Sequence, residues 1–271
     1  MVRRCEFCDS PVPADATICP ICHEEIAVET LERVLPMLKR PETAEIKAMG
    51  PLKRLYGIVR RPATAFRDIA QRPDTVGPFL IIIMNAAVMA GFFLAVSSKF
   101  TVTIVVNQTS GQTGTSSILF TDYGSTFLLS SLLSILPNIL LGMVFLLLGS
   151  IFAHLAFKVT GGKGSKGKTV SVVGYSMFPV VLIRLVGLIL ILMFMPAVNV
   201  NNPSTWSTTI QQIYDSGMWL ILDYLTTASF VWTGFLLVFG IREAHDTSTI
   251  WAFVVAVLCM IVLGWTFWQV H

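Results

Sequence analysis

Four cysteines near the N-terminus have the spacing of a metal site. Cys5 and Cys8 form one C-x-x-C pair, and Cys19 and Cys22 form a second pair after ten intervening residues. Each pair places two thiolates on one tight turn, and two facing turns complete a tetrahedral site for a single structural Zn²⁺. Disulfides are the alternative, but a reducing cytoplasm disfavours them, and the basic residues of the chain assign this segment to the cytoplasm. The sequence therefore predicts a four-cysteine zinc ribbon over residues 1–26.

The residues around these cysteines narrow the role of the ribbon. His23 adjoins Cys22 and could replace it as a ligand, although a solvated neighbour is the simpler interpretation, and Cys259 is interpreted as an apolar packing residue. Arg3 and Arg4 are the only cations near the cysteines in sequence, and five acidic residues outnumber them: Glu6, Asp9, Asp15, Glu24 and Glu25. Because phosphate binding requires positive charge, nucleic acid is not favoured as a partner. A protein-interaction or purely structural role is favoured.

Residues 162–169 read GKGSKGKT and match the phosphate-loop pattern G-x-x-x-x-G-K-[ST]. Such a loop functions where a buried strand leads into a helix whose first N–H groups surround the phosphates. Here the flanking segments are apolar and long enough to cross a membrane, so no soluble sheet can form around the loop. We interpret it as a flexible basic connector, and nucleotide binding is not favoured.

Polar residues inside apolar segments are costly in a membrane and are therefore candidates for function. They are Asn85, Asn138, His154, Arg184 and Asp223. Arg184 and Asp223 fall on consecutive apolar segments, which suggests an ion pair. Alternatively, Asp223 lies at the wetted outer boundary while Arg184 reaches to the interface alone or lines a small polar cavity. The sequence holds no ladder of carboxylates, no Cys/His/Asp catalytic cluster and no His-Glu-x-x-His motif, so no enzyme is predicted.

Five apolar segments of about 20 residues or more must position these side chains. A helix needs roughly 20 apolar residues to cross a bilayer, and 54% of the chain is hydrophobic while 13% is charged, against roughly 25% charged in soluble proteins. The segments are 78–97, 126–157, 170–195, 217–240 and 249–270. The predicted fold is an all-α membrane protein, a five-transmembrane-helix bundle over residues 77–271 with a small N-terminal cytoplasmic zinc ribbon.

The basic residues predict the orientation of the bundle. Twelve of the nineteen Lys and Arg residues precede residue 77, four more lie between the second and third segments, and Arg242 lies between the fourth and fifth. The opposite face carries only Lys99. Because cytoplasmic loops are enriched in Lys and Arg, we expect a multi-pass protein of the cell membrane with a cytoplasmic N-terminus and an extracytoplasmic C-terminus.

Residues 27–76 are predicted to form basic amphipathic helices. Six cations (Lys53, Arg54, Arg60, Arg61, Arg67 and Arg72) alternate with apolar residues directly before the first segment. This pattern fits helices lying among anionic lipid headgroups at the cytoplasmic face. The alternative is a soluble helix that packs on the loops.

Three local features refine the membrane segments and their loops. The outer loop over 98–125 alternates in polarity around NQTSGQTGTS, which predicts a β-hairpin, and it carries a glycosylation sequon at Asn107. Pro137 is expected to kink the long second segment or to divide it. The run 174–179, GYSMFP, is expected to interrupt the third segment early.

With these motifs in hand, residues 55–268 resemble the YIP family, the Ypt/Rab-interacting multi-span membrane proteins, in their prokaryotic form. The matching stretches are LYGIVRRPATAFRDIAQRPDTVGPFLI, HLAFKVTGGKGSKGKTVSVVGYSMFPVVL and VWTGFLLVFGIREAHDTSTIWAFVVAVL. The resemblance implies a five-helix membrane bundle and brings no catalytic residues. Eukaryotic members take part in vesicle trafficking and bind Rab GTPases through a cytoplasmic head, which a zinc ribbon and basic helices replace here, so that role is not carried over.

Two functions follow as hypotheses. The first is a non-enzymatic integral membrane protein, a membrane-organising or partner-recruiting scaffold whose head binds an unidentified protein. The alternative is a small transporter or channel that uses the polar residues of the third and fourth segments. The oligomeric state stays open, a homo-oligomer included.

Overall fold

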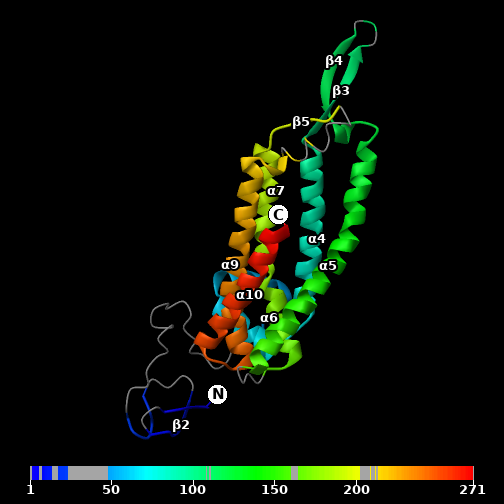
Figure 1. The fold of residues 1–271 in the computed structure, drawn as a ribbon. Coiled ribbons are helices and arrows are strands. Elements are labelled where there is room, and N and C mark those ends of the chain that lie inside the picture. Colours follow the sequence, from blue (N-terminus) through cyan, green and yellow to red (C-terminus); the bar gives the residue numbers. More distant parts are fainter. Residues whose placement is uncertain are drawn as a thin grey trace. The chain divides into compact units, whose positions relative to one another are not determined.

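A computed structural model of the chain describes residues 2–5, 8–13, 18–23, 48–107, 109, 111–159, 164–201, 208, 211 and 213–270. The described part is mostly helical (Figure 1). It divides into two compact units, each made of segments that are distant in sequence. Unit 1 comprises Met1–Pro78, Leu146–Ser176 and Thr233–His271, and unit 2 comprises Phe79–Phe145 and Met177–Trp232.

The N-terminal ribbon contains two short antiparallel strands, β1 (Val2–Arg4) and β2 (Pro11–Pro13). The backbone N–H of Cys5 donates to the carbonyl of Ser10 at 2.9 Å, which closes the first turn below the strands. Val12 is fully buried against the cysteines. Apart from these cysteines, the apolar core of the described ribbon is one valine, so the ribbon needs another source of stability.

In unit 1, a pair of helices precedes the first apolar helix. These are α2 (Pro51–Arg60) and α3 (Pro62–Gln71), and each begins with a proline, which suits a first helical turn because its missing N–H has no partner there. Both contact α6 (Lys166–Ser176). Their buried apolar side chains are Leu55, Ile58, Ala65, Phe66, Ile69 and Ala70. Residues 27–47 of the predicted amphipathic region lie outside the described residues.

Unit 1 also contains the second half of α5 (Gly124–Val159), the end of α9 (Gly217–His245), and α10 (Thr249–Val270). Glycine allows two close approaches here. A Cβ at Gly240 would lie 2.2 Å from Val172 Cγ1, and a Cβ at Gly174 would lie 2.4 Å from Pro78 Cβ. Since real Cβ contacts are never this short, α6 can pack as it does only with glycine at both positions.

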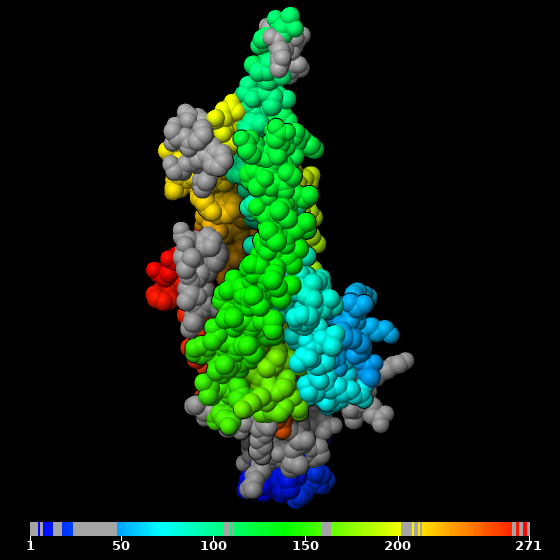
Figure 2. Space-filling model, turned by 90° about the vertical axis from the view of Figure 1, so that its right-hand side faces the viewer, coloured from blue at the N-terminus to red at the C-terminus, as the bar shows by residue number. Residues whose placement is uncertain are grey.

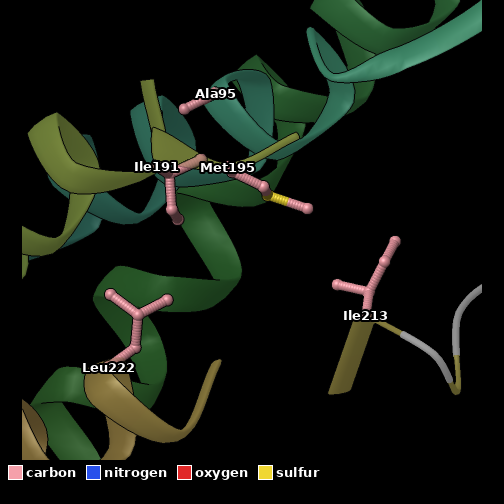
Figure 3. Close-up of a cluster of buried hydrophobic side chains, with 5 residues drawn as sticks. All are labelled: Ala95, Ile191, Met195, Ile213 and Leu222. Carbon is pink, nitrogen blue, oxygen red and sulfur yellow. The ribbon is translucent and has the colours of Figure 1, made fainter. Parts of the chain in front are cut away.

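Unit 2 packs α4 (Val76–Ser97), α7 (Phe178–Phe194) and the first parts of α5 and α9. Figure 3 shows its buried apolar cluster, which consists of Ala95, Ile191, Met195, Ile213 and Leu222. The Phe92 and Trp219 rings meet edge to face beside it, with centroids 6.3 Å apart. This core joins α4, α7 and α9.

The loops of unit 2 form a small sheet in the order β4-β3-β5 (Figure 1). The hairpin of β3 (Phe100–Asn107) and β4 (Gln112–Ser117) confirms the prediction for this loop, and its turn includes Gly111 at φ +65°. The sequence did not predict β5 (Val198–Asn199), which pairs in parallel with β3. Asn107 ends β3, and its side chain lies outside the described residues.

Four helices of the described chain are apolar and long enough to cross a membrane: Val76–Ser97, Gly124–Lys158, Lys166–Phe194 and Gly217–His245. A shorter apolar stretch, Thr249–Ile261, lies in α10. Along α5 the outward side chains are leucine, valine, isoleucine and phenylalanine, and this helix lies uncovered on the face drawn in Figure 2. Such a surface fits lipid and not water.

The expected irregularities fall where predicted but differ in form. Pro137 lies inside an uninterrupted α5, so it does not divide the segment. The neighbouring Asn138 side chain donates to the Ser134 carbonyl at 2.8 Å, one residue after the Leu133 carbonyl that the proline leaves without its usual helical N–H. The third segment does break, at Met177, and Pro179 lies in the first turn of α7.

Candidate functional site

The four thiols of the ribbon converge on one point. Their Sγ atoms all lie within 4.8 Å of one another, and Cys5–Cys22 and Cys8–Cys19 are each 3.6 Å apart. All four are free thiols and not disulfides. Cys5 and Cys19 are buried, while Cys8 and Cys22 are half-buried. The predicted ligands are therefore together, and they can hold a metal ion.

Both C-x-x-C pairs end in the same backbone turn. The N–H of Asp9 donates to the Cys5 carbonyl and the N–H of His23 donates to the Cys19 carbonyl, each at 2.9 Å. Asp9 and His23 also share the left-handed conformation, with φ of 53° and 56°. His23 is exposed and is not in the metal-binding group of the described residues. The two C-x-x-C pairs thus share one backbone geometry.

Hydrogen bonds prepare these thiols for a cation. Ser10 lowers the pKa of Cys8 to about 6, mainly through its side chain, whose Oγ lies 3.2 Å from Cys8 Sγ. The backbone N–H of Cys22 lowers the pKa of Cys19. Because the thiolate is the form that binds metal, Cys8 favours its metal-binding form at neutral pH.

A second polar site in unit 1 has Arg54 at its centre. Its Nε donates to Asp68 Oδ2 at 2.7 Å, its Nη1 pairs with Asp74 Oδ2, and its Nη2 donates to the Arg72 carbonyl at 2.9 Å. Arg54 is 4% exposed and Asp68 is 1% exposed. Burial opposes the charge, but the hydrogen bond and charge of Asp68, with Asp74, raise the pKa of Arg54. The guanidinium therefore stays charged.

Asp74 extends this site to the membrane helices. Its Oδ1 accepts the N–H of Gly77 at 2.8 Å at the start of α4, and its Oδ2 accepts the Tyr175 hydroxyl at 3.1 Å. Its backbone carbonyl accepts the Ser171 hydroxyl at 2.6 Å. We name Arg54, Asp68, Asp74, Ser171 and Tyr175 the Arg54 network. It connects α2, α3, the start of α4 and α6.

Two histidines share a hydroxyl in unit 1. Thr169 Oγ1 lies 3.2 Å from His154 Nδ1 and 2.9 Å from His245 Nε2. His245 is buried and stacks on Phe157 at 4.2 Å between ring centroids. A Cβ at Gly164 would lie 2.6 Å from His245 Nδ1. The predicted polar residue His154 is therefore part of a packed hydrogen-bonded cluster.

In unit 2, Arg184 of α7 donates from Nη1 to Asn85 Oδ1 of α4 at 2.6 Å. Both residues were singled out in the sequence, but their pairing was not predicted. Asp223 lies half-buried in α9. An amide partner satisfies one donor of the guanidinium but does not neutralise its charge.

The comparison with known families decides the identity. The family described as "Yip1 domain" matches residues 56–269. The chain belongs to the Yip1 family. No curated protein and no solved structure matches it. Its apolar helices and its family together make it a multi-pass membrane protein.

The matched region of this Yip1 protein contains residues of some of its polar sites but not the cysteine cluster. The four clustered cysteines precede the matched region, whereas Asp68, Asp74 and Tyr175 lie within it. Sequence reasoning missed the Arg54 network and assigned Arg54 to the lipid surface, which is wrong because the side chain is buried. The sequence did hold a signal for this network. Residues 51–74 contain six Lys and Arg residues but only two acidic residues, Asp68 and Asp74.

Proposed function

We propose that this Yip1-family protein is a non-enzymatic, five-span membrane scaffold whose zinc-ribbon head recruits a protein partner at the cytoplasmic face. In this proposal α10 is the fifth span, the N-terminus is cytoplasmic and the C-terminus lies outside the cell membrane. The distribution of Lys and Arg supports this orientation.

The convergence of the four thiols carries the proposal. Tetrahedral zinc with Zn–S bonds of about 2.3 Å requires Sγ–Sγ distances of about 3.8 Å, close to the 3.6 Å of the two contacts. Four thiolates without an open position favour a structural ion. A ribbon with so small an apolar core gains its folded shape from the metal, and the folded shape presents a surface to a partner.

Co-purification from native membranes tests the recruiting role. We expect crosslinking of the full chain to capture a protein that Cys8→Ser no longer captures, because the ribbon unfolds without its metal. Cys259→Ser is the matched control, since it removes a thiol of α10 and should keep the partner. A partner retained by Cys8→Ser would contradict recruitment through the ribbon.

The hydrogen bond between Arg184 and Asn85 favours a second candidate, a small transporter or channel. Placing an arginine at membrane depth costs about 2.5–3.5 kcal/mol or more in insertion free energy, so an arginine found there commonly has a function. We propose Asp223 as its counter-charge. A double-mutant cycle of Arg184→Ala and Asp223→Ala on thermal stability tests the pair, and strict additivity would exclude it. Solute flux in proteoliposomes that Arg184→Ala abolishes would favour transport over the scaffold.

A further inference from the structure

The outward face of α2 carries an apolar stripe that the described part of the protein does not cover. Leu52, Tyr56 and Val59 are 71%, 63% and 47% exposed, and their spacing of four and three residues places them in one row along the helix. The opposite face of α2 buries Leu55 and Ile58. The helix is therefore apolar on two sides, and among the described residues only its inner side is used in packing.

Cations flank this stripe. Lys53 and Arg60 are exposed on the same helix, and the Arg60 guanidinium donates to the Tyr56 hydroxyl at 2.6 Å and lies 5.9 Å from its ring centroid. The two carboxylates of residues 51–74 belong to the Arg54 network, where they bind Arg54. The outward face thus combines exposed apolar side chains with positive charge that no carboxylate of this segment neutralises.

The Arg54 network also determines where this face lies. It holds α2 against α6 and against Asp74, two residues before α4 begins. In Figures 1 and 2 the pair of α2 and α3 lies beside the last turns of α5 and not beyond the end of that helix. Membrane-spanning helices leave the hydrocarbon and meet the headgroups at their ends, so we expect α2 and α3 to lie at that boundary.

We propose that the outward face of α2, formed by Leu52, Lys53, Tyr56, Val59 and Arg60, binds anionic lipid headgroups of the membrane that the protein spans. Lys53 and Arg60 contact the lipid phosphates, and the apolar row enters the boundary between headgroups and acyl chains. Tyr56 suits this boundary, because its ring is apolar and its hydroxyl is polar. The site does not depend on the ribbon or on its partner, so either proposal can fail without the other.

Lipid titration of the purified full chain tests the charge. Phosphatidylglycerol should raise the thermal stability at lower concentration than phosphatidylcholine. In the variant Lys53→Gln/Arg60→Gln the apparent affinity for phosphatidylglycerol should fall by about fivefold for each cation. The matched control Lys53→Arg/Arg60→Lys keeps a positive charge at both positions and should keep the affinity. Equal losses in the two variants, or none in the first, would overturn the proposal.

The apolar row allows an experiment to distinguish binding of a lipid from binding of a free phosphate. Water-soluble glycerol phosphate has the same charged group but no acyl chains, so it should not stabilise the protein at concentrations at which phosphatidylglycerol does. If both act equally, the apolar row contributes nothing and lipid binding is wrong.

A spin label reports the environment directly. The variant is Leu52→Cys in a Cys259→Ala background, spin-labelled while zinc occupies the ribbon and then reconstituted in nanodiscs that contain phosphatidylglycerol. Oxygen should relax the spin label at position 52 more than a water-soluble nickel complex does. The Cys259→Ala chain alone is the blank for the ribbon thiols. Leu132→Cys and Thr113→Cys give the lipid and water references, since the first lies on the outward face of α5 and the second in β4. A water-like ratio at position 52 would overturn the proposal and favour a protein partner.

Discussion

At the scale of single residues, the ribbon shows how spacing becomes a site. Each C-x-x-C pair is followed by a left-handed residue, Asp9 or His23, and the sulfurs of both pairs lie within 4.8 Å of one another. Ser10 then lowers the pKa of Cys8 through a side-chain contact. All of these features lie within a few residues of the cysteines, which is why the sequence alone predicted that the four cysteines lie together.

Metal content tests this residue-scale interpretation. We expect purified protein to carry a single zinc ion per chain and Cys8→Ser to lose it, because three thiolates bind more weakly than four and metal binding supplies the folding free energy of the ribbon. Elemental analysis after gel filtration measures the ratio. Cys259→Ser should keep its zinc, and the helical circular dichroism of both variants should match that of the wild type. Zinc retained in a variant in which all four ribbon cysteines are replaced by serine would place the metal elsewhere.

At the scale of elements, α2 and α3 are held to the membrane helices by charge as well as by apolar packing. Arg54→Ala removes the only guanidinium that binds both Asp68 and Asp74 in the described part of the chain. Breaking a buried pair leaves an uncompensated charge, and we expect a loss of about 3–5 kcal/mol in unfolding free energy. Thermal unfolding in detergent, followed by tryptophan fluorescence, measures it.

The exposed neighbour Arg61 provides the control for this experiment, since it lies between the same two helices. Arg61→Ala should change the stability by no more than about 0.5 kcal/mol. Equal effects of the two substitutions would mean that the Arg54 network contributes no specific stability.

Close packing of α6 gives a second prediction for the elements. Gly174→Ala adds a Cβ 2.4 Å from Pro78 Cβ, and a proline ring cannot rotate away, so we expect a loss of about 1–3 kcal/mol from overpacking. Gly167→Ala on the same helix meets nothing within 4 Å. It should be neutral or slightly stabilising because alanine favours helix. The same detergent unfolding assay compares them, and a reversed order would refute the packing of α6 on Pro78.

The elements also show where sequence reasoning ends. The apolar length of α4 and the interruption at Met177 follow from local composition, and both were predicted. The Arg54 network was not, because Asp74 and Tyr175 are 101 residues apart and no local pattern joins them. Likewise β5 is two residues long and exists only by pairing with β3.

At the scale of the whole molecule, the orientation in the membrane is the property with the widest consequences, since it determines on which side of the membrane the ribbon lies. Single cysteines in a Cys259→Ala background can test it in sealed right-side-out vesicles. We expect an impermeant thiol reagent to label Thr113→Cys in the β-hairpin and Gln269→Cys at the end of α10, but not Ser165→Cys.

The choice of Ser165 follows from the structure, because its neighbour Gly164 has no room for a side chain beside His245. Labelling of Ser165→Cys only after the membrane is permeabilised would complete the test. Labelling of Ser165→Cys from outside would contradict the predicted orientation. Protection of Gln269→Cys would instead remove α10 from the set of spans.

Asp74 has a consequence for the order in which the protein assembles during synthesis. Its partner Arg54 lies 20 residues upstream and is already made when Asp74 emerges, as is Asp68, 14 residues after Arg54. The hydroxyls of Ser171 and Tyr175 come about a hundred residues later. Contacts between residues close in sequence form first, since their loops are cheaper to close. The ion pairs can therefore close before α6 is translated, so that α2 and α3 are already a folded platform when the later helices arrive to pack on it.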